Sequence, residues 1–303
     1  MRRILTLGCI FLGVFLIVVA VMLQTYGAGK LKRTPLDVDS VTHTAGDAVS
    51  YTAGFTPFQA KATTTTKADP KASTDDTVVF RTSACVVKDL GDIGDCVDDQ
   101  DPQARLVTAS TEDFAVDRTT AMPVKTDELG EPACKGLMNK WPFDVEKKTY
   151  PYCTTTGEVE AKYDGTAKIK GLETYKFQID VEPTAAEIAS GVEGLYSEQT
   201  TIWVEPTTGQ FVKVDTAQQR ALDETTKALD IHLIYTDEQI DEGVKDIGDD
   251  ADLLKLATST VPLIGYAVGI PLLLVGLALQ LLARRKQDGD DTGTKRKRKL
   301  VDA

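Results

Sequence analysis

The chain has 303 residues, with 34 Lys and Arg against 46 Asp and Glu, and a net charge of −12. The charge is segregated: residues 34–283 carry a net charge of −21, whereas residues 1–33 and 284–303 are both basic. A central region this acidic repels the phosphates of nucleic acids and of anionic lipid headgroups, which excludes nucleic acid as its partner.

The first predicted element is an apolar run at residues 4–29, which follows a three-residue N-terminus, 1–3. About 20 apolar residues cross a bilayer as a helix, so this run is long enough to do so. A cleaved signal peptide has an apolar core of about 7–15 residues. The length therefore favours a retained membrane helix, with cleavage as the alternative.

Residues 30–235 are rich in Thr, Val, Ile, Tyr and Phe, and many stretches alternate apolar with polar residues. Such alternation predicts antiparallel strands in a barrel-like or sandwich-like fold. The expected strand-rich runs are 51–68, 77–87, 105–110, 158–183, 198–222 and 226–236. A hairpin is expected in the fifth run, where Pro206 presets a turn and Gly209 supplies its left-handed position. The expected fold is thus a mainly β domain between two membrane helices.

Four cysteines lie in this region: Cys85, Cys96, Cys134 and Cys153. An even number in an exported domain predicts two disulfides, for which three pairings exist. We favour Cys85 with Cys96 and Cys134 with Cys153, because each bond closes a short loop. A zinc site is the alternative, but the region lacks a Cys-x-x-Cys pair, so we expect no metal.

Residues 89–102, "DLGDIGDCVDDQDP", form an acidic stretch. Carboxylates are ligands for calcium. However, the spacing does not match an EF-hand loop, which ends in a distant Glu. A solvated loop held by Cys96 is the preferred interpretation, and calcium binding is the alternative. No pattern typical of a catalytic site occurs, so we expect neither a catalytic residue nor a cofactor.

The stretch "KWPFDVEKKTYPYC", Lys140 to Cys153, fits neither a helical nor a strand period. Its prolines interrupt regular structure at both ends. We interpret it as a structural clasp whose aromatic residues Trp141, Phe143 and Tyr150 pack into the core, with the lysines outside. A ligand-contacting aromatic site is the alternative.

A stalk helix is predicted at residues 236–255, because "TDEQ" matches a capping box. A second apolar run, 256–283, follows and predicts another membrane helix. The tail, 284–303, begins with Arg284, Arg285 and Lys286. Positive charge marks the cytoplasmic flank of a membrane helix. We therefore expect a two-pass protein of the cell's inner membrane, with both termini cytoplasmic and the acidic domain outside.

Three segments, "WPFDVEKKTYPY", "IWVEPTTGQFV" and "VPLIGYAVGIPLLLVGLAL", together resemble an actinobacterial two-pass membrane family called the porin PorA family. The resemblance covers most of the chain. The positions that match the family pattern are Trp141, Pro142, Phe143, Glu146, Lys147, Tyr150, Trp203, Pro206 and Gly209. The chain departs from that pattern after Tyr150, where family members often have Trp and Asp and this chain has Tyr152, Cys153 and Thr154.

The resemblance implies an envelope protein connected with lipoglycan assembly, whose exported domain encloses a lipid-sized space. We expect a non-enzymatic protein that binds or passes a membrane lipid or lipoglycan precursor. One alternative is a scaffold or regulator of an envelope glycosyltransferase. The second is a channel, as the family name suggests. Long apolar helices and the lack of a lipid-facing strand pattern argue against an outer-membrane barrel.

Overall fold

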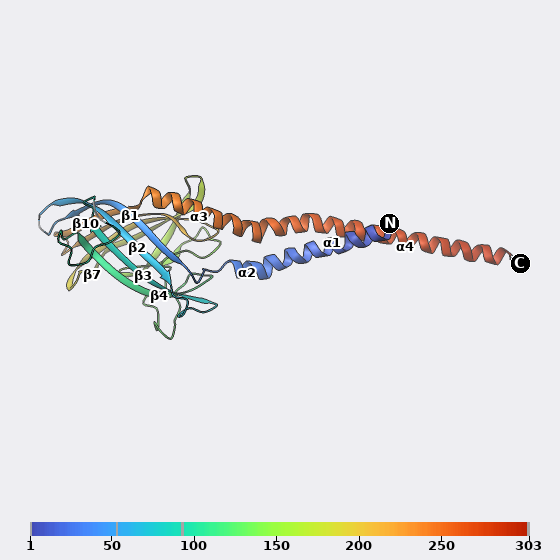
Figure 1. Cartoon of the computed structure of the whole chain (residues 1–303), viewed down its shortest axis with the longest axis horizontal. Coiled ribbons are helices and arrows are strands. Elements are labelled where there is room, and N and C mark those ends of the chain that lie inside the picture. Colours follow the sequence, from blue (N-terminus) through green and yellow to red (C-terminus); the bar gives the residue numbers. More distant parts are fainter. Residues whose placement is uncertain (1, 53, 92–93, 302–303) are drawn as a thin grey trace. The chain divides into compact units, whose positions relative to one another are not determined.

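The computed structural model describes residues 2–52, 54–91 and 94–301, with side chains described only between residues 4 and 282 (Figure 1). The chain divides into two compact units. The helical unit comprises Met1–Leu31 and Leu253–Ala303, and the β unit comprises Lys32–Asp252.

The β unit is built on one antiparallel sheet of ten strands, curled into a half-barrel (Figure 1). The strands are β1 Asp39–Ser50, β2 Thr56–Ala68, β3 Thr77–Lys88, β4 Leu106–Asp117, β5 Tyr150–Thr154, β6 Gly157–Ile169, β7 Leu172–Ala189, β8 Val192–Val204, β9 Phe211–Ala221 and β10 Lys227–Tyr235. Their spatial order is β4-β3-β2-β1-β10-β9-β8-β7-β6-β5. Strands β4 and β5 are therefore the two edges, which confirms the predicted mainly β, antiparallel class.

Strand β1 was not predicted, and it occupies the middle of the sheet between β2 and β10. Its sequence, "DSVTHTAGDAVS", contains Gly46 and Asp47, which are disfavoured in strands. Gly46 is required by close approach, because a Cβ at this position would lie 2.0 Å from the His232 carbonyl oxygen on β10. The run predicted at residues 51–68 corresponds to β2 and begins too early, because β2 starts at Thr56.

The half-barrel has two ends. We call the end where β1 begins and β10 ends the base, and the opposite end the tip. Antiparallel order places the connections β1–β2, β3–β4, β5–β6, β7–β8 and β9–β10 at the tip. The connection from β4 leaves the sheet at the base and reaches β5 after 32 residues, 118–149. We call this connection the clasp.

The sheet has an inner and an outer face, and we define the inner face as the one that contacts Trp141 of the clasp. Residue pairs in register continue this face across the strands, because side chains alternate between the faces. The pairs include Phe177 with Ile202, Ile202 with Val214, and Ala48 with Ile231. The main core lies here, and its fully buried members include Trp141, Leu137, Phe177, Ile179 and Ile202.

Helix α3, Asp237–Lys255, follows β10 directly. Thr236 caps it, as its hydroxyl accepts a hydrogen bond from the Gln239 amide at 3.1 Å. The Gln239 side chain does not complete the capping box, because its carbonyl accepts the His43 amide of β1 instead, at 3.0 Å. The helix buries Ile240, Ile247 and Ala251. Its first turn is thus attached to the base of the sheet.

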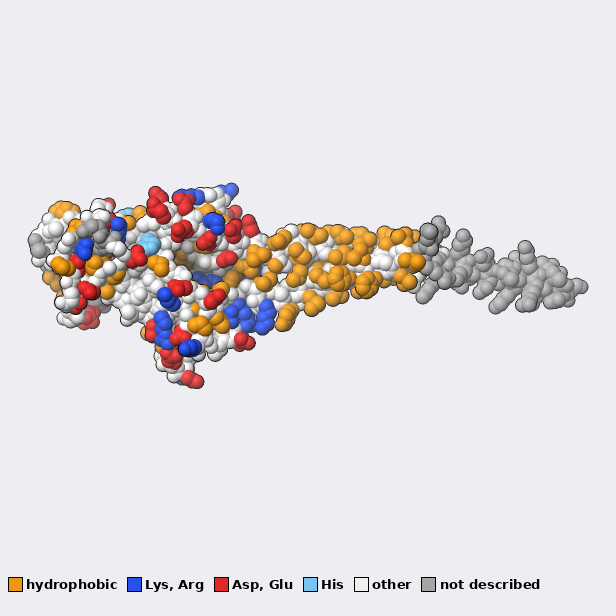
Figure 2. Space-filling view, in the orientation of Figure 1, with side chains coloured by type: hydrophobic (Ala, Val, Ile, Leu, Met, Phe, Trp, Pro, Cys, Tyr) orange, Lys and Arg blue, Asp and Glu red, His pale blue; other side chains and the backbone are white. Residues whose placement is uncertain are grey.

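The helical unit contains α1 Arg2–Met22, a π-helical turn Leu23–Gly27, α2 Ala28–Leu31, a second π-helical turn Leu256–Thr260, and α4 Val261–Val301. Helices α1 and α4 pack closely through glycines: a Cβ on Gly13 would lie 2.7 Å from the Leu273 amide nitrogen. Such small residues let membrane helices approach each other. Hydrophobic side chains cover most of the visible face of the described part of this unit (Figure 2).

Two stretches, Ile4–Leu31 and Asp237–Leu282, contain helix long and apolar enough to cross a membrane. They include the first predicted membrane run, 4–29, and the second, 256–283, except for its last residue. The predicted cytoplasmic flank, Arg284, Arg285 and Lys286, lies within α4. The side chains of these three residues lie outside the described part of the structure.

Candidate functional site

The predicted aromatic segment forms the centre of the core. Trp141 is fully buried, and its ring centroid lies 4.9 Å from that of Phe177 on β7 and 5.4 Å from that of Phe211 on β9. Tyr150 and Tyr152 of β5 approach it at 6.3 and 5.5 Å. These rings fill the inner face near the base. We call this cluster the aromatic plug.

The clasp is hydrogen-bonded to the turn between β8 and β9. The Trp141 amide donates to the Gly209 carbonyl at 2.7 Å, and the Val145 amide donates to the Pro206 carbonyl at 2.7 Å. Gly209 has φ +75°, and a Cβ there would lie 2.1 Å from the Trp141 carbonyl oxygen. Two segments separated by some sixty residues, each singled out by its sequence pattern, therefore form one structural unit.

Glu205 was not predicted as a key residue, although it is the acid of the "VEP" pattern. Its side chain is buried, with 1% of its surface exposed. The Oε2 atom accepts hydrogen bonds from the amides of Thr207 at 2.9 Å and Thr208 at 2.7 Å. A buried carboxylate is stable only when hydrogen-bonded in this way. Glu205 therefore shapes the turn that receives the clasp.

The clasp interpretation needs two corrections. Phe143 was expected in the core with Trp141 and Tyr150, but it is half-buried and lies outside their cluster. Lys140 was expected outside, but it is buried. Its residue surface is 8% exposed, and its Nζ sits 3.7 Å from the centroid of the Phe143 ring. Burial lowers the pKa of the Lys140 ammonium to about 7, and Asp250 of α3 partly opposes that shift. Four other positions of the predicted segment are less buried: Glu146 and Lys147 are exposed, and Pro142 and Phe143 are half-buried. The sequence contained no signal for the burial of Lys140.

Trp203 lies on the opposite face of β8 from Ile202 and Val204. It is half-buried, and the Nζ of Lys213 lies 4.7 Å from its ring centroid. It therefore takes no part in the aromatic plug. The two tryptophans of the resemblance have different environments, one in the core and one on the outer surface.

Farther toward the tip, the inner face carries an apolar wall. Ala48, Ala60 and Ile231 are buried there. The half-buried side chains around them are Phe58, Val86, Leu229 and Leu233. These seven residues come from β1, β2, β3 and β10. Because four large side chains remain partly exposed, this wall offers an apolar surface that the plug does not fill.

A hydrogen-bonded polar row lies beside the wall on β8 and β9. Arg220 Nε donates to Gln218 at 3.2 Å, and Gln218 Nε2 donates to the Tyr196 hydroxyl at 2.6 Å. That hydroxyl donates to Glu198, which also accepts the Thr200 hydroxyl at 2.7 Å. Burial, and next the Glu198 carboxylate, raises the pKa of Tyr196. The inner face thus combines apolar and polar surface.

Side chains of the two edge strands face the same interior. Burial raises the pKa of Glu112 on β4. Burial, followed by the charges of Glu198, Tyr235 and Glu112, raises the pKa of Tyr152 on β5. Residues from β4, β5, β8 and β10 therefore interact electrostatically across the inside of the half-barrel. No pairing joins β4 to β5 in the described strands.

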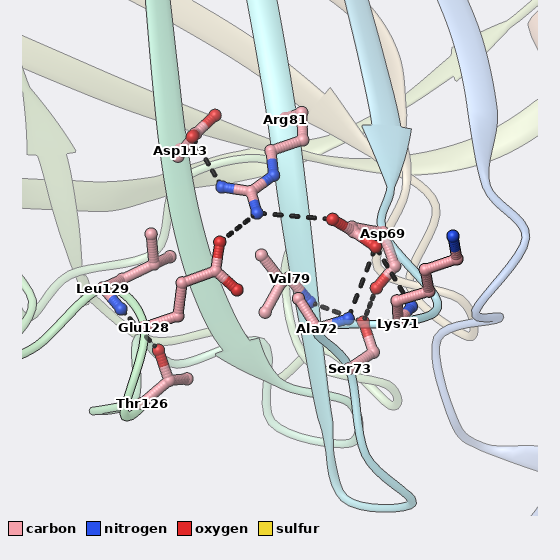
Figure 3. Close-up of polar contacts among 10 residues, drawn as sticks. All are labelled: Asp69, Lys71, Ala72, Ser73, Val79, Arg81, Asp113, Thr126, Glu128 and Leu129. Carbon is pink, nitrogen blue, oxygen red and sulfur yellow. Dashed lines mark hydrogen bonds and ion pairs between the residues drawn. The ribbon is translucent and has the colours of Figure 1, made fainter.

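The outer face carries many charged side chains, although Val79 and Cys85 of β3 are buried on it. Arg81 of β3 donates to Asp113 at 2.6 Å, to Asp69 at 3.3 Å and to Glu128 of the clasp (Figure 3). The hydrogen bonds to Glu128 and Asp113 are the main cause of a raised Arg81 pKa. On β6, the outward residues Glu158, Glu160 and Lys162 are exposed. Charged side chains are spread over the visible face of the β unit (Figure 2).

Both predicted disulfides are present, Cys85–Cys96 and Cys134–Cys153, in the favoured pairing. Cys134–Cys153 joins the clasp to β5. Cys85–Cys96 holds the β3–β4 connection, residues 89–105, which we call the acidic loop.

Two carboxylates of the acidic loop, in the stretch weighed as a calcium site, are bound to basic residues. Asp89 contacts Lys61 at 3.0 Å and Asp101 contacts Arg105 at 2.6 Å. Asp92 lies outside the described residues. Among the described residues, no group of His, Cys, Asp and Glu is arranged to hold a metal ion.

Comparison with known proteins gives two findings. The family model described as Porin PorA matches residues 5–278. A protein named Porin PorA from Corynebacterium amycolatum is 25% identical over an alignment of 226 residues, and the match covers 60% of this chain and 58% of that protein. The chain thus spans a little over half the length of this curated relative.

Proposed function

The chain belongs to the porin PorA family, and we propose that its β unit binds or passes a membrane lipid along the inner face of the half-barrel. The observation that carries the proposal is the apolar wall, which leaves Phe58, Val86, Leu229 and Leu233 partly exposed on a concave surface. Partly exposed apolar side chains that gather on one surface commonly mark a binding site.

The chemistry of the inner face suits an amphiphile. The apolar wall matches an acyl chain, and the neighbouring polar row, Tyr196, Glu198, Gln218 and Arg220, offers donors and acceptors to a headgroup. The described strands β4 and β5 do not pair with each other, although the clasp bridges each of them, β4 at Val116 and β5 at Tyr152; the proposed entry for a lipid lies between these two edges, beyond the bridges. In keeping with the family resemblance, a lipoglycan precursor is the proposed ligand class. The proposal assigns no catalytic step to the protein.

The proposal also includes where the protein lies in the cell. The two apolar helices would anchor the chain in the inner membrane, with both termini cytoplasmic and the β unit outside. Tethering at both ends holds the β unit close to a supply of lipid.

A channel is the second candidate, because the relative from Corynebacterium amycolatum is named a porin. Two observations make a pore through this sheet less favourable. The aromatic plug fills the inner face near the base. The outer face bears charged residues such as Glu158, Glu160 and Lys162, whereas a membrane-spanning barrel carries an apolar band there. A scaffold for an envelope glycosyltransferase is a third candidate function, and no observation in the described structure favours it over the other two.

The test compares two neighbouring positions on β10. Leu233 lies on the inner face and Ile234 on the outer face, and both are half-buried. The full-length protein is extracted in mild detergent, and its bound lipid is counted by native mass spectrometry. We expect wild type and Ile234→Gln to retain lipid that survives detergent exchange, and Leu233→Gln to lose it.

Equal retention by the two folded variants would refute binding on the inner face. Conductance of the wild-type protein in planar bilayers, abolished by substitutions of Glu112 and Glu198, would favour the channel instead.

A further inference from the structure

The exposed apolar side chains of the β unit gather at the tip of the half-barrel. Phe55 is 72% exposed, Leu222 48% and Val192 39%. Phe55 lies in the β1–β2 connection, Leu222 directly follows β9, and Val192 begins β8 after the β7–β8 turn. We call these three residues the apolar tip. Among the other large apolar residues described as exposed in this unit, Leu90 also lies in a tip connection and Val41 lies on β1.

The three turns of the apolar tip are neighbours. The strand order β2-β1-β10-β9-β8-β7 places the β1–β2, β9–β10 and β7–β8 hairpins side by side. The Tyr51 amide donates to the Ala228 carbonyl at 3.0 Å, which joins the first hairpin to the second. With strands about 4.8 Å apart, the row extends over roughly 20 Å.

The polar groups of these turns are used within the turns themselves. Asp223 accepts hydrogen bonds from the amides of Thr225 and Thr226, both at 2.8 Å. Glu187 accepts the Gly191 amide at 2.7 Å. The Leu222 amide donates to the Thr226 carbonyl at 2.8 Å. These bonds hold the backbone in place and turn the two carboxylates back toward it.

These three exposed apolar side chains lie on adjacent hairpins at one end of the sheet, so they are clustered rather than scattered singly over the surface. A stable protein interface needs a continuous patch of about 800 Å² on each partner. Three separate side chains on turns do not provide that, whereas a fluid lipid surface closes around each of them. The negative charge of this region disfavours anionic lipids. Glu193 and Glu224 lie in or beside the turns, and the central region as a whole is strongly acidic.

We propose that the apolar tip inserts into the surface of a zwitterionic lipid layer. Phe55, Val192 and Leu222 enter the boundary between headgroups and acyl chains, and the flanking carboxylates remain in water. This contact is separate from the inner face. It gives the β unit a second lipid-facing region, at the opposite end from the points where the chain enters and leaves the sheet.

The test uses the full chain in lipid nanodiscs, mixed with sucrose-loaded phosphatidylcholine vesicles that are collected by centrifugation. The key variant is Phe55→Ser with Leu222→Ser, and Val41→Ser is the matched control because it removes an exposed valine elsewhere. We expect wild type and Val41→Ser to sediment with the vesicles. The double variant should lose at least about tenfold in the bound fraction, since each buried apolar side chain contributes a tenfold factor or more.

Three outcomes would overturn the proposal: no sedimentation of the wild type, equal sedimentation of the double variant, or stronger binding to phosphatidylglycerol than to phosphatidylcholine vesicles. Circular dichroism confirms that the variants are folded, which is expected because both substituted side chains are exposed. Leu233→Gln should sediment like wild type. The inner-face proposal and the tip proposal can therefore fail independently.

Discussion

The clasp and the acidic loop are the two long connections of the β unit, and each is attached by one disulfide. The clasp, 118–149, carries fully buried Leu137 and Trp141. The acidic loop, 89–105, exposes Leu90 and the carboxylates of Asp95, Asp98 and Asp99, and buries the carboxylate of Asp101 against Arg105. The two disulfides therefore act in different surroundings. The disulfide of the clasp holds a segment that also packs into the hydrophobic core, whereas the disulfide of the acidic loop holds a segment that is mostly exposed.

The noncovalent contacts differ in the same way. The clasp donates backbone amides of Trp141 and Val145 to the β8–β9 turn. In the acidic loop, Asp89 pairs with Lys61 at a partly exposed position, which contributes little to stability, and the buried pair of Asp101 with Arg105 lies within the loop itself. We therefore expect changes in the clasp to act on the whole β unit and changes in the acidic loop to act locally.

Replacement of Trp141 by Ala should have the largest effect. The indole is fully buried among four aromatic rings, and its loss leaves a cavity that costs about 3–5 kcal/mol. Trp203→Ala is the matched control, because that side chain is half-buried on the outer face and should cost about 1 kcal/mol. Thermal and urea unfolding of the full chain in detergent measure the difference. Unchanged stability together with lost lipid retention would show that Trp141 contacts a ligand.

Removal of Cys134–Cys153 by paired Ser substitutions should rank next. The bond spans 19 residues, and its contribution through the unfolded chain is about 3 kcal/mol. Hydrogen exchange should rise across the clasp and β5 together, because the Leu137 amide donates to the Pro151 carbonyl of β5 and the Leu137 carbonyl accepts the Cys153 amide. Exchange confined to the few residues around the cysteines would contradict the view that the clasp belongs to the core.

Removal of Cys85–Cys96 should have a smaller and more local effect. This bond spans only 11 residues, and its contribution is no more than about 2–3 kcal/mol. Hydrogen exchange should rise in residues 94–105 and remain unchanged at Trp141. A loss of stability larger than that of the Cys134 and Cys153 variant would reverse the comparison.

The predictable part of the fold follows from local chemistry. The turn at Pro206 and Gly209, the capping residue Thr236 and the pairing of the cysteines each depend on a few neighbouring residues, and the structure agrees with them. Strand β1 depends on its partners instead. It was missed because the contacts from β2 and β10 override the weak strand preference of Gly46 and Asp47.

In the candidate site, too, some features follow from the local sequence and others depend on contacts between distant segments. The aromatic pattern was enough to predict that Trp141 and Tyr150 pack into the core, and both are buried. The docking of Trp141 on Gly209 joins segments far apart in sequence, so no local pattern contains it. The apolar wall likewise comes from four strands. Its members are ordinary strand residues until the sheet curls and brings them to one concave face.

For Lys140, the prediction is the direction in which stability changes with pH. Burial lowers its pKa from 10.5 to about 7, so between these values the unfolded chain binds more protons than the folded one. Stability should therefore rise with pH from about 7 toward 10, by up to about 1.4 kcal/mol per pH unit. Lys140→Met should remove this slope and be more stable than wild type at pH 7, whereas exposed Lys147→Met should keep it. Unfolding midpoints between about pH 7.5 and 9.5, below the range where tyrosines titrate, measure both slopes. An unchanged slope in Lys140→Met would mean that the ammonium is hydrated, and that this part of the clasp is as open to water as the acidic loop.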